Sequence, residues 1–179
     1  VDDLAGLIDR LGIEDVVLCG LSVGGLIAQG LYARRPELVS GLVLCDTAHK
    51  IGTQESWNAR IATVKKDGIE AIADAVMKAW FTPDFHARHT NELAGCRNML
   101  VRQNVDGYIA TCVALREADY TGVATSIAVP TLCIGGDQDG STPPDLVRSL
   151  ADLIAGSRFE VIADAGHIPC IERPEALAA

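Results

Sequence analysis

Short apolar runs alternate with helix-patterned segments in the first and last thirds of the chain. Apolar residues recur at helical spacing over residues 2–11, 23–34 and 144–155. Consecutive apolar positions predict four strands, at residues 16–19, 42–45, 131–134 and 159–162. Runs that are apolar on both faces are typical of strands covered on both sides, so we predict a parallel sheet with crossover helices, an α/β fold.

The middle of the chain, from residue 54 to about residue 120, predicts helices and no convincing strand. An apolar stripe at positions i, i+3, i+4, i+7, i+8 and i+11 is formed by Ile69, Ile72, Ala73, Val76, Met77 and Trp80. We therefore predict a helical insertion at residues 48–127, between the two parts of an α/β core at residues 1–47 and 128–179.

Composition and charge narrow the class of protein. The 179 residues are 49% apolar and 22% charged, which is enough to bury one substantial core. With 15 Lys and Arg against 24 Asp and Glu, the net charge is −9, which disfavours nucleic acid as a partner. The sequence has no run of 18 apolar residues and no secretory signal pattern, so we expect a soluble protein without a membrane partner.

The cysteines and histidines give no metal-ligand pattern. The six cysteines form no Cys-x-x-Cys pair and three lie inside apolar runs, which predicts reduced thiols in a cytoplasmic protein. His86 and His89 are three positions apart and could share a helix face, but the pair is not part of a metal-ligand spacing pattern. Their spacing therefore favours solvated side chains over a metal site.

The sharpest chemical signal is the segment Gly20-Leu21-Ser22-Val23-Gly24-Gly25, between a predicted strand and a predicted helix. In this context the Gly-x-Ser-x-Gly pattern indicates a nucleophile elbow. We expect the glycines two residues on either side of Ser22 to avoid Cβ collisions, and the Val23 N–H to stabilise an oxyanion. A dinucleotide-binding turn or a plain turn is the alternative, but the dinucleotide pattern needs glycine where Ser22 stands.

A serine nucleophile needs a base and an orienting carboxylate, and both follow later in the chain. Asp139 comes soon after the strand at 131–134, and His167 soon after the strand that ends at residue 162. The order Ser, Asp, His, each after a strand, is the α/β-hydrolase arrangement. Asp137 is the rival acid, and we favour Asp139 for its spacing from the flanking glycine and proline. A calcium loop here would lack a third acidic ligand and the closing glutamate.

The sequence resembles the α/β-hydrolase superfamily and, within it, the 3-oxoadipate enol-lactonases of aromatic catabolism. The superfamily resemblance rests on Gly20 to Gly25, on Asp139 with Thr142-Pro143, and on Gly166-His167 followed by Glu172-x-Pro174. The narrower resemblance rests on four segments, Asp46 to Gly52, Trp57 to Ile61, Ala79 to Thr82 and Gly107 to Asp119. These lie mainly in the predicted insertion. The resemblance implies an α/β-hydrolase fold with a mostly parallel sheet and an inserted helical cap that shapes substrate choice.

The resemblance also implies a carboxylic ester hydrolase that opens a small enol-lactone bearing an acetate arm to give 3-oxoadipate. Ser22 would attack the lactone carbonyl, His167 would act as base, and Asp139 would hold the imidazole. No cofactor and no metal is needed. The alternatives with the same fold are a carboxylesterase, a carbon–carbon bond hydrolase, a perhydrolase, or an inactive fragment or non-catalytic binding member.

An anionic lactone that approaches a protein of charge −9 needs a local cation. We expect Arg60 or Arg116 to bind the carboxylate, with Lys50 third, because a planar guanidinium can hold a carboxylate through two hydrogen bonds. Trp57 and Trp80 are candidates for the apolar wall of the site. Trp80 fits the core of the cap better, because it belongs to the apolar stripe.

The chain begins at Val1 with a helical pattern already under way, and its last residues resemble the first turn of a further helix. The resemblance implies earlier strands and a second oxyanion amide, for which no segment precedes Val1. We therefore expect about two thirds of a hydrolase, without its N-terminal strands, in which the strand at 16–19 is an edge that other polypeptide pairs with. The expected protein partner is a separate N-terminal segment or a second copy of the chain.

Overall fold

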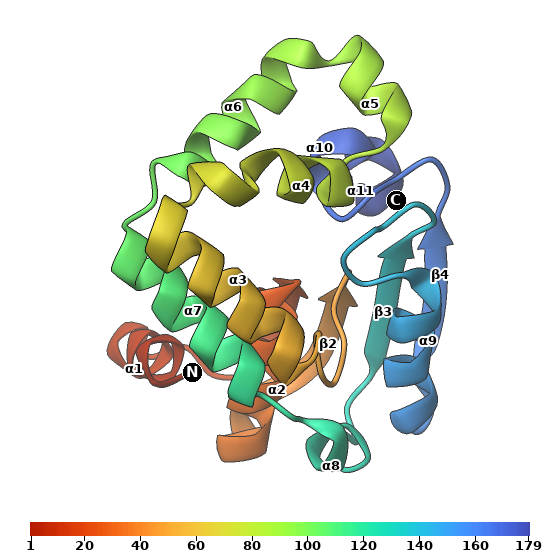
Figure 1. Ribbon diagram of the computed structural model, residues 1–179. Helices are drawn as coiled ribbons and strands as arrows, with labels where there is room; N and C mark the ends of the chain where they lie inside the picture. The colour runs from red at the N-terminus through yellow and green to blue at the C-terminus, as the bar shows by residue number, and fades with distance from the viewer.

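The computed structural model describes residues 1–179 and contains one four-stranded sheet (Figure 1). Its strands are β1 Val16–Leu21, β2 Val39–Cys45, β3 Thr131–Gly136 and β4 Arg158–Ile162. They are all parallel and stand in the order β1-β2-β3-β4. The four predicted strands and the parallel sheet are confirmed, and each strand is longer than its apolar run.

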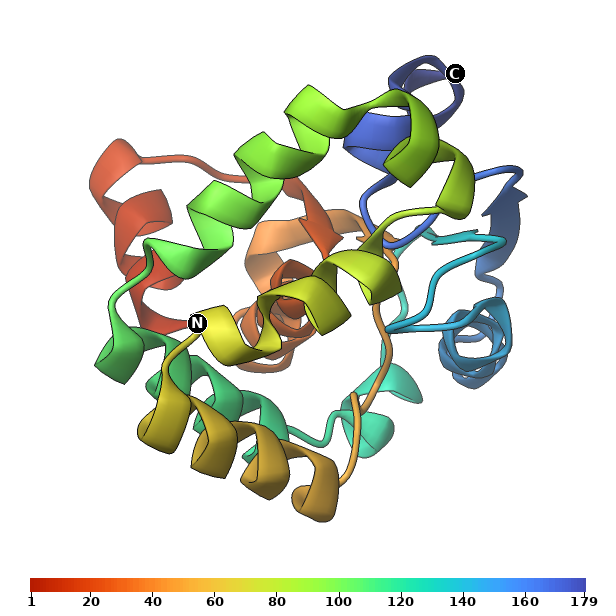
Figure 2. The ribbon, with the colours of Figure 1, turned by 45° about the horizontal axis from the view of Figure 1, so that its top comes forward.

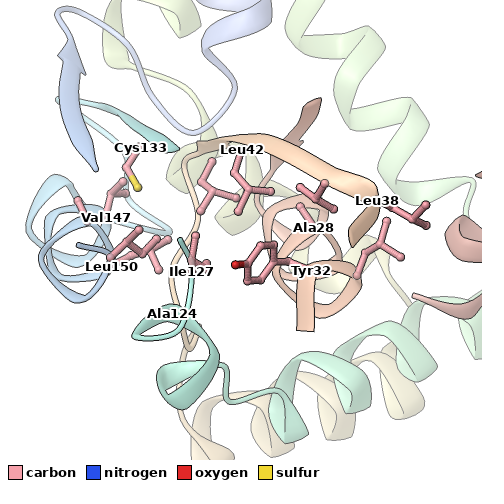
Figure 3. Close-up of a cluster of buried hydrophobic side chains, with 14 of the residues drawn as sticks. Ala28, Tyr32, Leu38, Leu42, Ala124, Ile127, Cys133, Val147 and Leu150 are labelled. Carbon is pink, nitrogen blue, oxygen red and sulfur yellow. The ribbon is translucent and has the colours of Figure 1, made fainter. Parts of the chain in front are cut away.

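Helices pack on one face of the sheet and enclose the main hydrophobic core. These elements are α1 Asp2–Leu11, α2 Val23–Arg34, the short 3-10 helix η1 Pro36–Leu38, α8 Thr121–Ala124 and α9 Pro144–Leu153. Figure 3 shows Leu42 of β2, Ala28 and Tyr32 of α2, and Val147 and Leu150 of α9 gathered in this core. Burying an aliphatic side chain of this kind contributes about 1.5–3 kcal/mol, so the core anchors α2 and α9 against the sheet.

Five further helices form a group between β2 and β3 in the sequence. They are α3 Gln54–Asp67, α4 Glu70–Trp80, α5 Pro83–Arg88, α6 Thr90–Val101 and α7 Val105–Glu117. α3 and α7 lie side by side, and α4 packs against α6 (Figures 1 and 2). Thr53, Thr82 and Asn104 each accept the N–H of the third helical residue, which fixes where α3, α5 and α7 begin.

A second hydrophobic core holds these helices together. The predicted stripe on α4 contributes Ala73, Val76 and Met77 to it. Their buried partners outside α4 include Phe81, Phe85, Cys96 and Leu100. The helical prediction for the middle of the chain is confirmed, while its division into core and insertion stays a prediction. Near the proposed boundary at residue 127, Ala124 and Ile127 pack in the main hydrophobic core and not in this second core.

The expectation that every strand is covered on both faces is wrong for β1 and β4 within residues 1–179. Side chains of β1 alternate in burial, and Val17 is 65% exposed because α2 packs on the opposite face. β1 and β4 are the edges of the sheet, and Val161 of β4 is also exposed. The apolar runs therefore predicted the strands correctly, but they did not predict how much of each strand is buried by helices.

The opposite face of the sheet carries the last helices of the chain, α10 Pro169–Glu172 and α11 Pro174–Ala178. Leu177 of α11 packs against a small cluster that contains Ile134 and Ile162. All six cysteines are free thiols, two of them exposed and four buried. None of the helices combines the length and the apolar character that crossing a membrane requires.

The carboxyl ends of the strands lie close to the end of α4. After β3, the Gly140 N–H donates to the carbonyl oxygen of Ala79 at 3.0 Å, and after β4, the His167 N–H donates to that of Trp80 at 2.8 Å. In Figure 1 the arrowheads of β3 and β4 point towards the group of five helices. Ligands bind outside the carboxyl ends of strands in open parallel sheets, so this edge is the place to look for a site.

Candidate active site

Ser22 stands at the turn between the end of β1 and the start of α2. Its backbone has φ 54° and ψ −118°, a sparsely populated conformation that costs a residue of order 1–3 kcal/mol. The Ser22 N–H donates to the carbonyl oxygen of Cys45 at 2.9 Å, and the Ser22 carbonyl oxygen accepts from Thr47 Oγ1 at 2.7 Å. Hydrogen bonds to residues at and just after the end of β2 thus hold the strained turn and present the Ser22 side chain at the edge of the sheet.

The glycines around Ser22 do not all have the predicted role. A Cβ on Gly20 would lie 2.4 Å from the carbonyl oxygen of Gly24, so the start of α2 can approach β1 only if residue 20 is glycine. A Cβ on Gly24 would meet nothing within 4 Å, so the expectation of a collision there is wrong. Gly25 takes that part instead, because its Cβ would lie 2.4 Å from Thr47 Cγ2.

Asp139 and His167 form a buried pair, with Nδ1 of His167 2.8 Å from Oδ2 of Asp139. Asp139 Oδ1 accepts the N–H groups of Ser141 at 2.7 Å and Thr142 at 3.0 Å, and Oδ2 also accepts the Thr142 hydroxyl at 2.7 Å. Burial opposes ionisation of Asp139, but His167 and these donors outweigh it and hold the pKa of Asp139 below its ordinary value. An ionised Asp139 keeps the proton on Nδ1 and leaves Nε2 for a reacting group.

Asp137, the rival for the acid, has a different partner. Its Oδ1 accepts the Ala165 N–H at 3.1 Å, and the residue is exposed. Asp139, the favoured candidate, is the carboxylate that contacts His167. Asp137 and Asp139 therefore contact different groups, the Ala165 N–H and the His167 ring. These separate contacts favour a structural turn over a calcium loop.

The loop that carries His167 is tied to the end of α4 by a second carboxylate. Glu172 is buried, and its Oε1 accepts the N–H of Thr82 at 2.9 Å and the Thr82 hydroxyl at 2.8 Å. Its Oε2 accepts the Gly166 N–H at 2.5 Å. A buried carboxylate with three donors is well satisfied, so Glu172 fastens the residue before His167 to the connection between α4 and α5.

Asp46 is a residue of this site for which the sequence predicted no individual role. It directly follows β2, is fully buried and has a φ of 44°. Its Oδ1 accepts the Gly136 N–H at 2.8 Å, while Oδ2 is buried without a hydrogen-bond partner. A carboxyl oxygen of Asp46 lies within 4.8 Å of both Asp139 and His167. The signal that found Asp139, a polar residue just past a parallel strand, also applied to Asp46.

The spacing of Asp46, Asp139 and His167 raises the question of a metal ion, because one polar atom of each lies within 4.8 Å of the others. The Asp139 oxygen and the His167 nitrogen are only 2.8 Å apart. Two ligand atoms of a tetrahedral zinc ion stand about 3.3 Å apart, given metal–ligand distances near 2.0 Å. The separation of the pair is therefore that of a hydrogen bond.

A cavity of about 230 Å³ lies next to this pair, and both Ser22 and His167 line it. Val23 lines it as well, and as the first residue of α2 it carries one of the N–H groups that a helix leaves without an internal partner. The side chains contributed by α3, α6 and α7 are Trp57, Arg60, Leu100, Tyr108, Thr111, Cys112 and Leu115. The cavity thus joins the Ser22 turn to a largely apolar wall.

Arg60 is the predicted cation that reaches this cavity. Its guanidinium carbon lies 5.1 Å from the ring centroid of Trp57, and Trp57 Nε1 donates to the carbonyl oxygen of Ile51 at 2.7 Å, which fixes the ring. Burial raises the pKa of the neighbouring Tyr108 although the Arg60 charge acts in the opposite direction, so its phenol stays neutral. Tyr108 belongs to the segment from Gly107 to Asp119, in which the sequence predicted no separate role for it. Its place beside Arg60 depends on how α3 packs against α7.

The other two cations are engaged elsewhere. Arg116 donates to Asn58 Oδ1 at 2.6 Å and to Glu117 Oε1 at 2.8 Å, and it does not line the cavity. Lys50 pairs with Asp119 at 3.1 Å on the exposed surface. Neither Arg116 nor Lys50 lines this cavity, so of the three predicted cations only Arg60 is placed to meet a ligand there.

Trp80 lies both in the wall of the cavity and against the second hydrophobic core, the two positions that the sequence suggested. Its ring lines the cavity with a centroid 6.0 Å from that of His167. It also packs against the second hydrophobic core, as its position on the α4 stripe predicts. Trp80 therefore links the packing of the five helices to the surroundings of the His167 ring.

Comparison with known proteins matches the chain to a described family. The pattern of the alpha/beta hydrolase family matches residues 1–179. The chain is 34% identical over 174 residues to 3-oxoadipate enol-lactonase 2 of Acinetobacter baylyi, which covers 97% of this chain and 65% of that protein. The curated relatives with that name are thus spanned over about 65% of their own length.

Solved structures of related proteins also match this chain over nearly all of its length. The enol-lactonase from Burkholderia xenovorans LB400 superposes with a TM-score of 0.93 at 40% identity, over 98% of this chain and 67% of that one. A thermophilic esterase from Thermogutta terrifontis superposes with a TM-score of 0.91 at 30% identity, over 98% of this chain and 66% of that one. The similarity includes both a lactonase and an esterase, so it supports the fold more firmly than any one substrate.

Proposed function

The chain belongs to the alpha/beta hydrolase family, and on that premise we propose that it hydrolyses a carboxylic ester with Ser22 as nucleophile, His167 as base and Asp139 as orienting acid. The substrate we propose is a small enol-lactone that carries a carboxylate, 3-oxoadipate enol-lactone, which is opened to 3-oxoadipate in aromatic catabolism. The observation that carries the proposal is one cavity lined by Ser22, His167 and Arg60, with Asp139 bonded to the far side of the imidazole.

The first half of the reaction forms an acyl-enzyme. Ser22 Oγ attacks the lactone carbonyl carbon as its proton passes to His167 Nε2, and Asp139 stabilises the imidazolium that results. The Val23 N–H at the start of α2 stabilises the oxyanion of the tetrahedral intermediate. Collapse of the intermediate breaks the ring C–O bond. The leaving oxygen takes the proton from His167 as an enol, which ketonises while the acyl group remains on Ser22.

The second half releases the acid. Water attacks the acyl carbon as it gives a proton to His167, and the C–O bond to Ser22 breaks as the serine oxygen regains that proton. Both halves use the same three side chains, and water in the second half is the only reactant besides the lactone. The strained Ser22 turn supports this proposal, because it keeps the nucleophile in the wall of the cavity in both halves.

Arg60 supports the choice of a substrate with a carboxylate. Its guanidinium lines a cavity whose wall is otherwise largely apolar, and it stacks on Trp57. A charge-assisted hydrogen bond in such a setting is worth about 1.5–3 kcal/mol. The relatives named enol-lactonases, at 34% and 40% identity, point to the same substrate.

A simple carboxylesterase is the second candidate, supported by the similarity to the Thermogutta terrifontis esterase. The two candidates share the nucleophile and differ in their use of Arg60. Turnover of 3-oxoadipate enol-lactone and of p-nitrophenyl acetate by the full-length protein separates them. We expect kcat/KM to be higher for the lactone.

The Ser22→Ala variant tests the mechanism in the same assay. Loss of the nucleophile should lower kcat by at least about 10⁴-fold for both substrates. Ser126→Ala is the matched control, because Ser126 is exposed and its hydroxyl bonds only to the carbonyl oxygen of Val123 in its own turn. Turnover of the ester without turnover of the lactone would reject the enol-lactone as the substrate, but it would not contradict Ser22 as the nucleophile. Undiminished turnover in Ser22→Ala would reject the mechanism.

A further inference from the structure

Two buried carboxyl groups lie near the His167 ring, and only one of them has a place in the proposed mechanism. Asp139 bonds to Nδ1, while Asp46 comes from the neighbouring strand and lies within 4.8 Å of both. We propose that Asp46 is a positioning residue that holds a proton at neutral pH and acts as a neutral brace beside the Asp139–His167 pair. The catalytic role of the Asp139–His167 pair rests on the proposed function. The protonation of Asp46 can be measured whether or not that function is correct.

The hydrogen bonds decide which of the two carboxyl groups holds the proton. Asp139 has four donors, two N–H groups on Oδ1 and the Thr142 hydroxyl and His167 on Oδ2, which is the full capacity of an ionised carboxylate. Asp46 has one donor, the Gly136 N–H on Oδ1, and its Oδ2 has none. A buried anionic oxygen without a donor is costly, whereas a protonated one is tolerated. The proton therefore belongs on Asp46.

The carboxyl and thiol groups around Asp46 disfavour a second negative charge there. Asp139 and His167 approach from the loops after β3 and β4, and the carboxylate of Glu172 and the thiol of Cys170 face it from α10. Its neighbour in the chain, at the end of β2, is the Cys45 thiol, which burial keeps protonated. No lysine or arginine is among these groups. Burial, with the nearby charges of Asp139 and Glu172, raises the pKa of Asp46 to about 8 despite the opposing Gly136 hydrogen bond.

The brace has a mechanical part and an electrostatic part. Asp46 Oδ1 bonds to the last residue of β3 and the Asp46 N–H donates to the carbonyl oxygen of Ile134 at 2.8 Å, so the residue joins the ends of β2 and β3. The loop that carries Asp139 starts at this junction. A neutral Asp46 supports that loop without competing with Asp139 for His167. An ionised Asp46 would repel Asp139 and weaken its bond to Nδ1.

Asp46→Asn is the variant that separates a neutral brace from a second anion. Asparagine keeps the shape and a carbonyl acceptor for the Gly136 N–H, removes the charge at every pH, and tolerates the positive φ of 44°. Asp137→Asn is the control, because Asp137 lies on the adjoining loop but is exposed. Asp46→Asn should keep kcat/KM at pH 7 within about threefold of the wild type.

Infrared spectroscopy of the full-length protein tests the proton directly. We expect the carbonyl band of a protonated carboxyl group at pH 7, retained in Asp137→Asn and absent in Asp46→Asn. In the wild type this band should fade as the pH rises, with a midpoint at about pH 8. This titration requires no variant to fold and no substrate to turn over. Absence of the band at pH 7, or its survival in Asp46→Asn, would overturn the proposal.

The activity profile tests the positioning role. With p-nitrophenyl acetate, wild-type kcat/KM should fall above about pH 8, whereas that of Asp46→Asn should not. A merely structural Asp46 would leave both profiles parallel, and a need for an anion at this position would make Asp46→Asn inactive at pH 7. Either result overturns the positioning role. Failure of the proposed function would instead appear as no turnover in any variant, with the infrared band still present.

Discussion

Arg60 is the side chain that we expect to select the substrate, because it is the arginine that lines the cavity beside Trp57. Arg60→Gln should raise KM for 3-oxoadipate enol-lactone by about tenfold to a hundredfold, the effect of losing one charge-assisted hydrogen bond. It should leave kcat nearly unchanged, since the side chain binds the carboxylate equally before and during the reaction. Steady-state kinetics of the two purified proteins measure both constants.

Arg116→Gln is the matched control for this experiment. Arg116 lies on α7 as Arg60 lies on α3, but its guanidinium bonds to Asn58 and Glu117 outside the cavity. We expect its KM for the lactone to stay at the wild-type value. Equal effects of the two substitutions, or an equal effect of Arg60→Gln on neutral p-nitrophenyl acetate, would contradict a carboxylate site at Arg60.

Individual site residues were predictable to the extent that the sequence placed them near the end of a strand. That rule found Ser22, Asp139 and His167, and it would have found Asp46 had every polar residue in such a position been considered. It could not choose between Arg60 and Arg116. That choice depends on which side of each helix faces the cavity, and therefore on the contact between α3 and α7.

The connection from β1 to α2 is the element that the proposed chemistry needs most. Gly20→Ala should destabilise the chain by about 1–3 kcal/mol, because the new methyl group would lie 2.4 Å from the carbonyl oxygen of Gly24 and force the helix away from the strand. Gly24→Ala should be neutral or stabilising by up to about 1 kcal/mol, because its methyl group meets nothing and alanine favours a helix. Urea unfolding of the two variants measures the difference.

This pair of variants is informative because the sequence motif treats the two glycines alike. Equal destabilisation by both substitutions would contradict the packing seen at the turn. A destabilising Gly25→Ala, by contrast, agrees with it, since that methyl group would lie 2.4 Å from Thr47 Cγ2.

Helices and strands followed from apolar periodicity more reliably than their surroundings did. The pattern gave all four strands, and it gave α1 and α2 with their observed bounds. The expectation that β1 is an edge strand came from the family resemblance and not from this pattern. The pattern did not show that Val17 and Val161 are exposed, because both are as apolar as the buried residues of β2. Apolar character reports what a side chain prefers, whereas its exposure depends on which elements pack against it.

The sheet and the five helices meet where the proposed chemistry occurs. The end of α4 binds the loops after β3 and β4 through backbone hydrogen bonds, and Glu172 adds a buried carboxylate to the same junction. In the sequence, Glu172 and the segment from Ala79 to Thr82 are recognisable as parts of motifs, but nothing there indicates that they contact each other. Only the fold shows that they bind each other, because they are about ninety positions apart in the chain.

Labelling of the full-length protein with a fluorophosphonate, followed by mass spectrometry of its peptides, tests most directly whether these parts form one nucleophilic site. Such a reagent reacts rapidly only with a serine whose proton is removed by an adjacent base. We predict one adduct per chain, located on Ser22, and none on the folded Ser22→Ala or His167→Ala variants. An adduct on another serine, or an unlabelled Ser22 in folded protein, would contradict the assignment of Ser22, His167 and Asp139 as a catalytic triad.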